Sequence, residues 1–314
     1  MAGDLLPVGD AIARVTQDVE PTLAETVPLG AALNRVLAEP LAARRTQPPF
    51  DVSAMDGYAV RAADVAALPA LLTEIGAAPA GHAFAGTVGP DQTVRIFTGA
   101  PVPDGADAIL LQEDAVVEAD GRIRATETVR PRQHIRAKGL DFVEGDILLP
   151  PGARLGMRQL TLAASLNHGA VPVRRRPRVA IIATGDELVA PGSELGPHQI
   201  VASNSFGIAA LVELLGGTAI DLGIVPDDRA KLAATIDRAT ASGADILVTL
   251  GGASVGEHDF VREVLVERGM KLDFWKIAMR PGKPLMFGRL GDVRCIGLPG
   301  NPVASIVCSQ LFLK

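Results

Sequence analysis

The residue types best suited to ligand chemistry in this sequence gather in a glycine-rich segment at residues 249–259. An apolar run at 245–249 predicts a buried strand before this segment, and residues 261–267 predict a helix after it. Glycines at the carboxyl end of a parallel strand let backbone N–H groups approach an anionic ligand beside a helix N-terminus. Ser254 can donate to a phosphate oxygen, whereas Asp259 could also simply cap the helix. The segment predicts an anion site that involves Gly251, Gly252, Ser254, Gly256 and Asp259.

A second polar turn follows the predicted strand at residues 179–183. It contains Thr184, Gly185, Asp186 and Glu187. Ligands bind outside the carboxyl ends of strands in open α/β sheets, so these groups could hold a ligand's polar atoms or a cation. A turn closed by an Asp side-chain hydrogen bond explains the same residues without a ligand. The motif alone leaves both interpretations open.

Three cations lie within eight residues of one another, on a segment that two prolines and a glycine make stiff. They are Lys276, Arg280 and Lys283. In a chain with a formal net charge of -6, this cluster predicts a clamp for an anion. The alternative is a solvated basic turn, but rigid loops on a scaffold tend to carry function.

Another turn between a strand and a helix lies at residues 297–302. The helix that begins at Pro302 supplies unpaired N–H groups that can bind an anion. A tight turn explains glycine and proline at one place, but it does not explain their recurrence at several strand ends. The candidate ligand contacts here are Pro299, Asn301 and Pro302.

The first half of the chain carries three more polar segments, at residues 48–59, 97–101 and 139–141. They contain Asp56, Thr98 and Asp141, which lie far in sequence from the glycine-rich turns. Each segment can be a loop without chemistry. The acids also suggest a composite site between domains or between subunits.

Composition limits the classes of function. A net charge of -6 disfavours a broad nucleic-acid surface, and the lone run Arg174-Arg175-Arg176 fits a solvated face better. The N-terminus lacks the pattern of a signal peptide, and no apolar run is long enough to span a bilayer. Cys295 and Cys308 have no histidine at metal-ligand spacing, which predicts two buried reduced thiols. We expect a cytoplasmic protein with no nucleic-acid partner and no membrane partner.

The elements that must position these residues change in type near residue 48. Short β-type runs at 93–97, 108–112 and 115–118, punctuated by glycines, predict a β-rich domain at 48–136. Helical spacing on either side predicts helices within three segments, at 8–20, 28–38 and 157–167. The β-rich domain is therefore expected to be inserted into a mixed helical region formed by residues 1–47 and 137–176.

Regular alternation of strands and helices follows from residue 177 to residue 314. This alternation predicts a parallel sheet with right-handed crossovers. The predicted fold class is a multidomain α/β protein, in which a three-layer α/β domain at 177–314 carries most of the candidate site residues.

Six motifs occur in the same order as in the molybdopterin molybdenumtransferases, the MoeA family, which are similar to the C-terminal domain of gephyrin. The motifs lie at residues 53–59, 98–101, 184–187, 251–256, 281–284 and 298–302. The resemblance implies insertion of molybdate into adenylylated molybdopterin with release of AMP, which forms molybdenum cofactor. It also implies an elongated homodimer with its active site between subunits, and contact with the pterin-adenylylating protein.

The resemblance implies a catalytic role for five acids, which are Asp56, Asp141, Glu187, Asp227 and Asp259. Such acids can bind Mg²⁺, a hard cation that prefers oxygen ligands, or activate water for phosphoanhydride cleavage. The three cations of the stiff segment would compensate the charge of the anionic substrates without covalent catalysis.

Two features depart from the family pattern. The family carries a further C-terminal β domain, which we expect this chain to lack. Members of the family usually have lysine at the position of Arg280. The alternative function is a non-catalytic molybdopterin-binding or scaffold protein of the same fold, as gephyrin's anchoring role illustrates. The retained acids favour the enzyme. A domain of the pterin-adenylylating type would share only the alternating region, and the motif at 53–59 argues against it.

Overall fold

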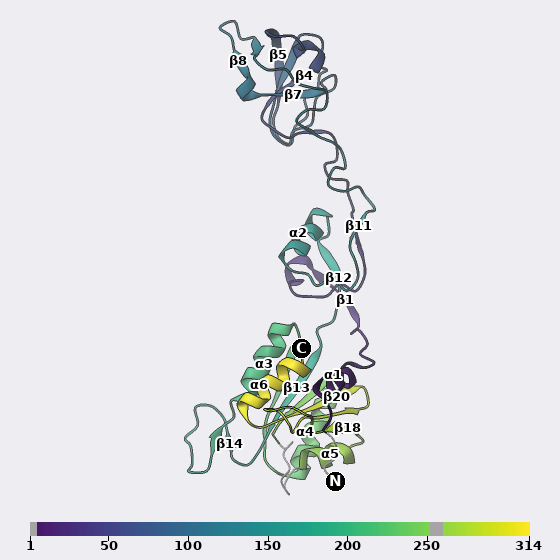
Figure 1. The fold of residues 1–314 in the computed structure, drawn as a ribbon, viewed down its shortest axis with the longest axis vertical. Coiled ribbons are helices and arrows are strands. Elements are labelled where there is room, and N and C mark those ends of the chain that lie inside the picture. The colour runs from purple at the N-terminus through teal and green to yellow at the C-terminus, as the bar shows by residue number, and fades with distance from the viewer. Residues whose placement is uncertain (1–4, 252–259) are drawn as a thin grey trace. The chain divides into compact units, whose positions relative to one another are not determined.

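The computed structural model of the chain describes residues 5–251 and 260–314, and its contacts divide the chain into two units (Figure 1). Unit 1 contains Met1–Thr26, Asn34–Val36 and Pro172–Lys314, and unit 2 contains Val27–Leu33 and Leu37–Val171. Each unit is built around its own six-stranded sheet. Within the described residues, no helix has the length and apolar content that a membrane span requires.

The sheet of unit 1 has five strands that run in one direction and one strand that runs in the opposite direction. Its spatial order is β16 (Thr218–Val225), β13 (Arg178–Thr184), β17 (Ile246–Leu250), β20 (Val293–Leu298), β19 (Met286–Leu290) and β18 (Lys271–Trp275). The strands from β16 to β20 are parallel, whereas β19 is antiparallel to both of its neighbours. The sequence predicted the parallel part. β19 differs because only Gly291 and Asp292 connect it to β20, and a two-residue turn joins antiparallel strands.

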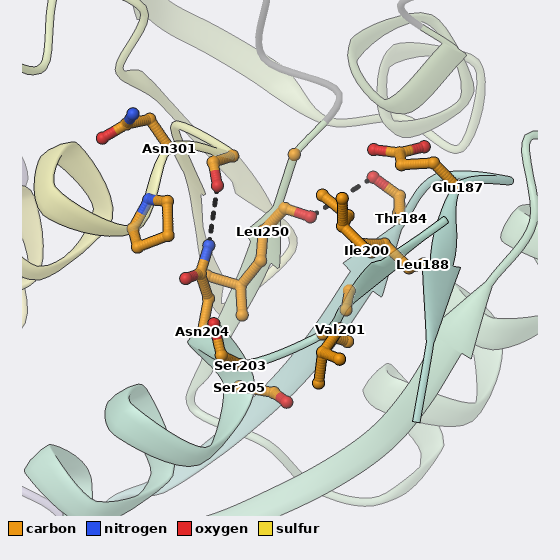
Figure 2. A pocket seen from close by; sticks show the side chains of 15 residues that line it. Thr184, Glu187, Leu188, Ile200, Val201, Ser203, Asn204, Ser205, Leu250 and Asn301 are labelled. Atoms are coloured by element: carbon orange, nitrogen blue, oxygen red, sulfur yellow. Dashed lines mark hydrogen bonds between the residues drawn. The ribbon is translucent and has the colours of Figure 1, made fainter. Parts of the chain in front are cut away.

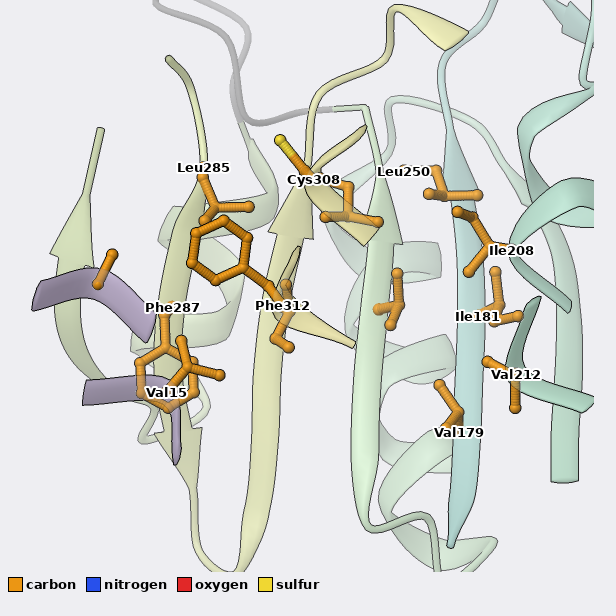
Figure 3. Close-up of a cluster of buried hydrophobic side chains, with 14 of the residues drawn as sticks. Val15, Val179, Ile181, Ile208, Val212, Leu250, Leu285, Phe287, Cys308 and Phe312 are labelled. Atoms are coloured by element: carbon orange, nitrogen blue, oxygen red, sulfur yellow. The ribbon is translucent and has the colours of Figure 1, made fainter. Parts of the chain in front are cut away.

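Helices cover both faces of this sheet, which confirms the predicted three-layer α/β domain. One face packs against α1 (Val8–Thr16), α3 (Asn204–Leu215) and α6 (Pro302–Phe312), and the other against α4 (Arg229–Ala241) and α5 (Phe260–Glu267). Along β13, Ile181 and its alternate neighbours enter the first core, while Ile182 enters the second. Figure 3 shows the first core, where Ile208 of α3 and Phe312 of α6 lie against the strands.

The beginning of the chain belongs to unit 1, although the prediction grouped residues 1–47 with 137–176. Ala11 and Val15 of α1 are buried in the first core of the sheet. Their burial explains the difference, because an amphipathic helix is stabilised mainly by the apolar surface that it covers. The helix also ends earlier than the predicted segment 8–20, because Gln17 is extended and Asp18 adopts a left-handed φ of 54°. The other boundaries of the three predicted regions stay a prediction.

Unit 2 contains a mixed sheet within residues 48–136, which confirms the predicted β-rich insert. Its order is β7 (Ala108–Leu111), β4 (Gly57–Val60), β6 (Gln92–Ile96), β5 (Ala70–Ala78), β9 (Ile123–Ala125) and β8 (Ala115–Val117). All pairs are antiparallel except β5 with β6. Alternation along β4 places Tyr58 and Val60 in one core and Ala59 in another, so both faces of the sheet are covered.

Helix content elsewhere in unit 2 is low. The predicted helix at 157–167 is α2 (Met157–Ser165), but the one expected within 28–38 is wrong. That segment forms only a 3-10 turn, η1 (Leu29–Ala31), because Gly30 is a poor helix former and Asn34 adopts a left-handed φ of 62°.

Short elements complete the described chain. Two more 3-10 turns are η2 (Ala62–Val65) and η3 (Gln112–Asp114). Two-stranded pairs are β1 (Ala24–Pro28) with β12 (Ala170–Arg174), β2 (Leu41–Ala42) with β11 (Ile147–Leu149), β3 (Val52–Ser53) with β10 (Ile135–Arg136), and β14 (Leu188–Val189) with β15 (Ile200–Val201).

Candidate functional site

A pocket of about 310 Å³ lies at the carboxyl edge of the parallel strands of unit 1 (Figure 2). Its apolar side chains are Leu188, Ile200, Val201 and Leu250, and its polar side chains are Thr184, Glu187, Ser203, Asn204, Ser205 and Asn301. They come from the ends of β13 and β17, from β14 and β15 with the turn before β14, from the turn after β20 and from the start of α3. An apolar wall with a few converging polar groups is the usual composition of a small-molecule site.

The turn after β13 holds the carboxylate of Glu187 close to its own backbone. Gly185 has a φ of 145°, and a Cβ atom at this position would lie 2.4 Å from Oε2 of Glu187. The Gly185 N–H donates to the carbonyl of Val225 at 3.2 Å, and Oδ1 of Asp186 accepts from the Asp227 N–H at 3.0 Å. These bonds tie the ends of β13 and β16 together, so the acids of both turns lie at one edge.

The turns after β13, β17 and β20 pack backbone against backbone. A Cβ atom at Gly251, which has a φ of 91°, would lie 2.8 Å from the carbonyl oxygen of Thr184. A Cβ atom at Gly300 would lie 3.5 Å from the Cα atom of Gly251. The Gly251 N–H also donates to the Leu298 carbonyl at 3.2 Å. Glycine at 251 therefore permits a close approach that any side chain would prevent.

The turn before α6 is fixed by two asparagines. Oδ1 of Asn301 accepts from the Ala304 N–H at 3.1 Å, which caps the helix that Pro302 begins. Nδ2 of Asn204 donates to the carbonyl of Gly300 at 2.8 Å (Figure 2). Pro299 is buried behind this turn.

The cationic loop leaves β18 at the same edge of the sheet, because β18 runs in the direction of β20. The loop is closed by a hydrogen bond from the Lys276 N–H to the Leu285 carbonyl at 2.9 Å. Nζ of Lys276 lies 3.9 Å from the ring centroid of Trp275, whereas Arg280 and Lys283 are exposed. None of these three cations forms an ion pair with a described carboxylate. Their charge is therefore not neutralised within the described part of the chain, although they do not line the pocket.

In unit 2, Asp56 and Thr98 lie in direct contact. Oδ1 of Asp56 accepts from both the N–H and the hydroxyl of Thr98, each at 2.8 Å. These two hydrogen bonds hold the pKa of the Asp56 carboxyl below its usual value, and the bond from the backbone N–H has the larger effect. Asp141 lies elsewhere in the unit, where Nη2 of Arg136 donates to its two oxygens at 3.1 and 3.2 Å. Both acids are exposed, as a role toward a ligand requires.

The structure brings only some of the predicted site residues together. Thr184, Glu187, Gly251, Asn301 and Pro302 line the pocket, and Gly185, Asp186 and Asp227 lie beside it, whereas Asp56, Thr98 and Asp141 belong to unit 2. Gly252, Ser254, Gly256 and Asp259 lie outside the described residues.

Sequence reasoning missed the wall that α3 contributes. Ser203, Asn204 and Ser205 line the pocket, but none of the candidate segments taken from the sequence includes them. A Ser-Asn-Ser run before an apolar helix is a start signal, and it could have drawn attention to this segment.

The arginine run at 174–176 has an internal role, so the expectation of a solvated face is wrong. Arg175 donates to both oxygens of Asp245, at 2.7 and 3.1 Å. Arg174 donates to the Thr22 carbonyl at 3.1 Å, and Arg176 donates to the Gly216 carbonyl at 3.2 Å. All three residues are half-buried, because their guanidinium groups satisfy carbonyl and carboxylate oxygens within unit 1.

The predicted thiols are confirmed. Cys295 and Cys308 are free and buried, and burial raises the pKa of Cys308 to about 11 and that of Cys295 to about 12. No three His, Cys, Asp or Glu side chains converge as metal ligands within the described residues.

Two family descriptions together match most of the chain. Residues 6–167 match the MoeA N-terminal region (domain I and II), and residues 180–314 match a probable molybdopterin binding domain. The protein named molybdopterin molybdenumtransferase in Haemophilus influenzae is 42% identical over 292 residues, which are 91% of this chain and 70% of that protein. The protein of the same name in Bacillus subtilis is 36% identical, over 98% of this chain and 73% of the relative.

A solved structure has the same fold. The molybdopterin biosynthesis MoeA protein of Pyrococcus horikoshii superposes with a TM-score of 0.83 at 34% sequence identity. The match covers 99% of this chain and 78% of that chain.

Proposed function

Because the chain belongs to the molybdopterin molybdenumtransferases, the MoeA family, we propose that it inserts molybdate into adenylylated molybdopterin and releases AMP, forming molybdenum cofactor. A role in molybdenum cofactor biosynthesis follows from the family. The observation that supports the specific reaction best is the pocket at the carboxyl edge of the sheet, with an unneutralised cationic loop at the same edge.

The chemistry of the substrates suits these groups. Molybdate and the adenylylated pterin are anions, so Lys276, Arg280 and Lys283 would compensate their charge without forming a covalent intermediate. The apolar wall around Leu250 would accommodate the flat heterocycle.

Cleavage of the phosphoanhydride requires a water molecule and a group that accepts its proton. Glu187 lines the pocket and is exposed, so it can act as this base. Asp56 stays ionised because Thr98 stabilises its carboxylate, so we assign it to charge stabilisation or metal binding. We also propose catalytic roles for Asp141, Asp227 and Asp259, as acids that bind the metal ion or activate water.

Mg²⁺ is the proposed cofactor. Mg²⁺ binds through one or two carboxylates together with substrate phosphates, so a preformed cluster of three acids is not required. Asp186 and Asp227, whose turns are joined by a hydrogen bond, offer exposed oxygen donors of the kind that suits this ion. The ion would neutralise phosphate charge when bound.

The proposed assembly is a homodimer in the cytoplasm. Its proposed partner is the pterin-adenylylating protein, because that class of enzyme must supply the adenylylated substrate. A second copy of the chain would bring the acids of unit 2 to the substrate held by unit 1.

The decisive experiment measures two products from one reaction. The purified chain is mixed with adenylylated molybdopterin, molybdate and Mg²⁺, and AMP release is followed together with reconstitution of a molybdenum enzyme that lacks its cofactor. The proposal expects both products to form and to depend on molybdate. Glu187→Gln should bind the pterin but release AMP slowly. Tight pterin binding by the original chain with no AMP release would instead establish the non-catalytic alternative.

A further inference from the structure

We propose that Asn204 is a positioning residue, which fixes the first turn of α3 against the turn before α6 and so sets the shape of the pocket for its substrate. The inference rests on the proposed function for the identity of that substrate. It concerns a residue that none of the six family motifs contains.

The contact joins two distant parts of the chain. Nδ2 of Asn204 donates to the Gly300 carbonyl at 2.8 Å, across 96 residues of sequence. Asn204 is half-buried, and both residues line the pocket (Figure 2). The hydrogen bond therefore spans from one wall of the pocket to another.

The side chains beside this contact do not reproduce it. Oδ1 of Asn301 is an acceptor and caps α6 through the Ala304 N–H, and Ser203 makes no side-chain cap bond at the start of α3. The turn that carries Gly300 also rests on the backbone of Gly251. By holding the Gly300 carbonyl, Asn204 links α3 to the glycine turns that form the base of the pocket.

The consequence belongs to substrate binding more than to the chemical step. If the bridge is lost, α3 and the turn before α6 can separate, and the bound substrate loses its fixed position. KM and the dissociation constant should rise, while kcat changes little, because Asn204 supplies no acid or base.

The test compares two substitutions at Asn204 with a charge-matched variant. Asn204→Ala removes the amide, and Asn204→Asp keeps the shape but replaces the donor with a carboxylate that repels the Gly300 carbonyl. Ser203→Asp places the same charge one residue earlier and leaves the bridge intact. Each full-length variant is titrated with adenylylated molybdopterin, and AMP release is measured over a range of substrate concentrations.

We expect Asn204→Ala to raise the dissociation constant by roughly two- to thirteen-fold, the range for loss of one neutral hydrogen bond. Asn204→Asp should weaken binding more than Ser203→Asp. Equal effects of the two aspartates would overturn the inference and leave charge alone as the cause.

Hydrogen–deuterium exchange gives a readout that is independent of turnover. In Asn204→Ala, the amides at residues 203–209 and 298–305 should exchange faster. Leu214→Ala, at an exposed position near the other end of α3, should leave both segments unchanged. Unchanged exchange in Asn204→Ala would refute the bridge even if the chain had no transferase activity. Absence of AMP release by the original chain, with exchange altered as expected, would instead reject only the proposed function.

Discussion

At the scale of single residues, the cations of the loop after β18 differ in their surroundings. Lys276 lies over the Trp275 ring, while Lys283 is exposed and has no ion pair with a described residue. A cation held over an aromatic ring is partly stabilised by that ring, whereas Lys283 is free to meet an anion. Lys283 is therefore the better position at which to test the clamp.

Lys283→Ala should weaken binding of adenylylated molybdopterin by roughly 10- to 150-fold, since a charge-assisted hydrogen bond contributes about 1.5–3 kcal/mol. Stability should change by less than about 0.5 kcal/mol, because the side chain is exposed. Titration calorimetry measures the first quantity and urea unfolding the second. Lys271→Ala removes the same charge from the opposite end of β18 and is the control. Equal dissociation constants for the two variants would make the loop only a basic turn.

Gly185 offers a second test, because its backbone and the carboxylate of Glu187 occupy adjoining space. Gly185→Ala strains a φ of 145° and places a Cβ atom 2.4 Å from Oε2 of Glu187, so the carboxylate must move. We expect AMP release to fall by roughly 100-fold, the cost of misplacing a catalytic group by about 1 Å.

Gly192 supplies the control for backbone strain. It has a φ of 86° with open space around it, so Gly192→Ala strains the backbone without moving a carboxylate. This variant should lose stability, by about 1–3 kcal/mol, but keep its turnover. Comparable losses of turnover in the two variants would mean that the effect at 185 is strain alone.

At the scale of elements, Asp245 joins the strands of unit 1 at the edge opposite the pocket. Its carboxylate accepts from Arg175 at 2.7 Å and from the Arg178 N–H at 2.7 Å. Burial alone would raise the pKa of this carboxyl, but the bonds from Arg175 and from the Arg178 N–H outweigh burial and keep the pKa below its usual value. The ionised form therefore stabilises the fold above the unfolded pKa, and this contribution is lost as the pH falls through the folded pKa.

Asp245→Asn should lower the free energy of unfolding by roughly 1–2 kcal/mol at pH 7, after allowance for solvent screening. The difference from the original chain should shrink below about pH 4, where the carboxyl takes up a proton. Urea unfolding followed by fluorescence of Trp275, the single tryptophan, reports on unit 1. Asp237→Asn, which breaks an exposed pair with Arg268, should cost under about 1 kcal/mol. A difference at Asp245 that persists unchanged at pH 3 would contradict this account.

Much of the α/β unit could be predicted from local patterns. The predicted strands at 179–183 and 245–249 are β13 and β17, and the predicted helix at 261–267 is α5, each with ends within one residue of the prediction, because apolar runs mark the strands and helical spacing marks the helix. β4 and β5 were not predicted, because Gly57 and the alanines of β5 have low β propensity and their pairing depends on distant strands. Asn204 was missed for a related reason. Its partner is a backbone carbonyl 96 residues away. Every residue has a backbone carbonyl, so the sequence does not indicate which one accepts this hydrogen bond.

At the scale of the whole molecule, the proposed homodimer predicts how much AMP release is recovered when two inactive variants are mixed. Asp56 belongs to unit 2 and Glu187 to unit 1, so a site shared between subunits would take one residue from each chain. Asp56→Asn and Glu187→Gln should each be nearly inactive alone.

Mixing the two variants with subunit exchange should restore about a quarter of the original AMP release. Half of the randomly assorted dimers would be mixed, and each mixed dimer would have one intact site of two. Light scattering should give twice the mass of the 32.6-kDa chain. No recovery on mixing, in a sample that is dimeric and exchanging, would place both acids in sites formed by a single chain.

The position of α1 also governs the order in which the molecule can be completed during its synthesis. α1 packs into the core of the α/β sheet, and its Arg14 donates to Asp273 across 259 residues. At a translation rate of about 5–20 residues per second, roughly 13–52 s separate the emergence of these two residues from the ribosome. Unit 2 is made entirely within that interval and can fold first. The apolar face of α1 therefore stays unburied for most of that interval, and the core of the α/β unit is completed last.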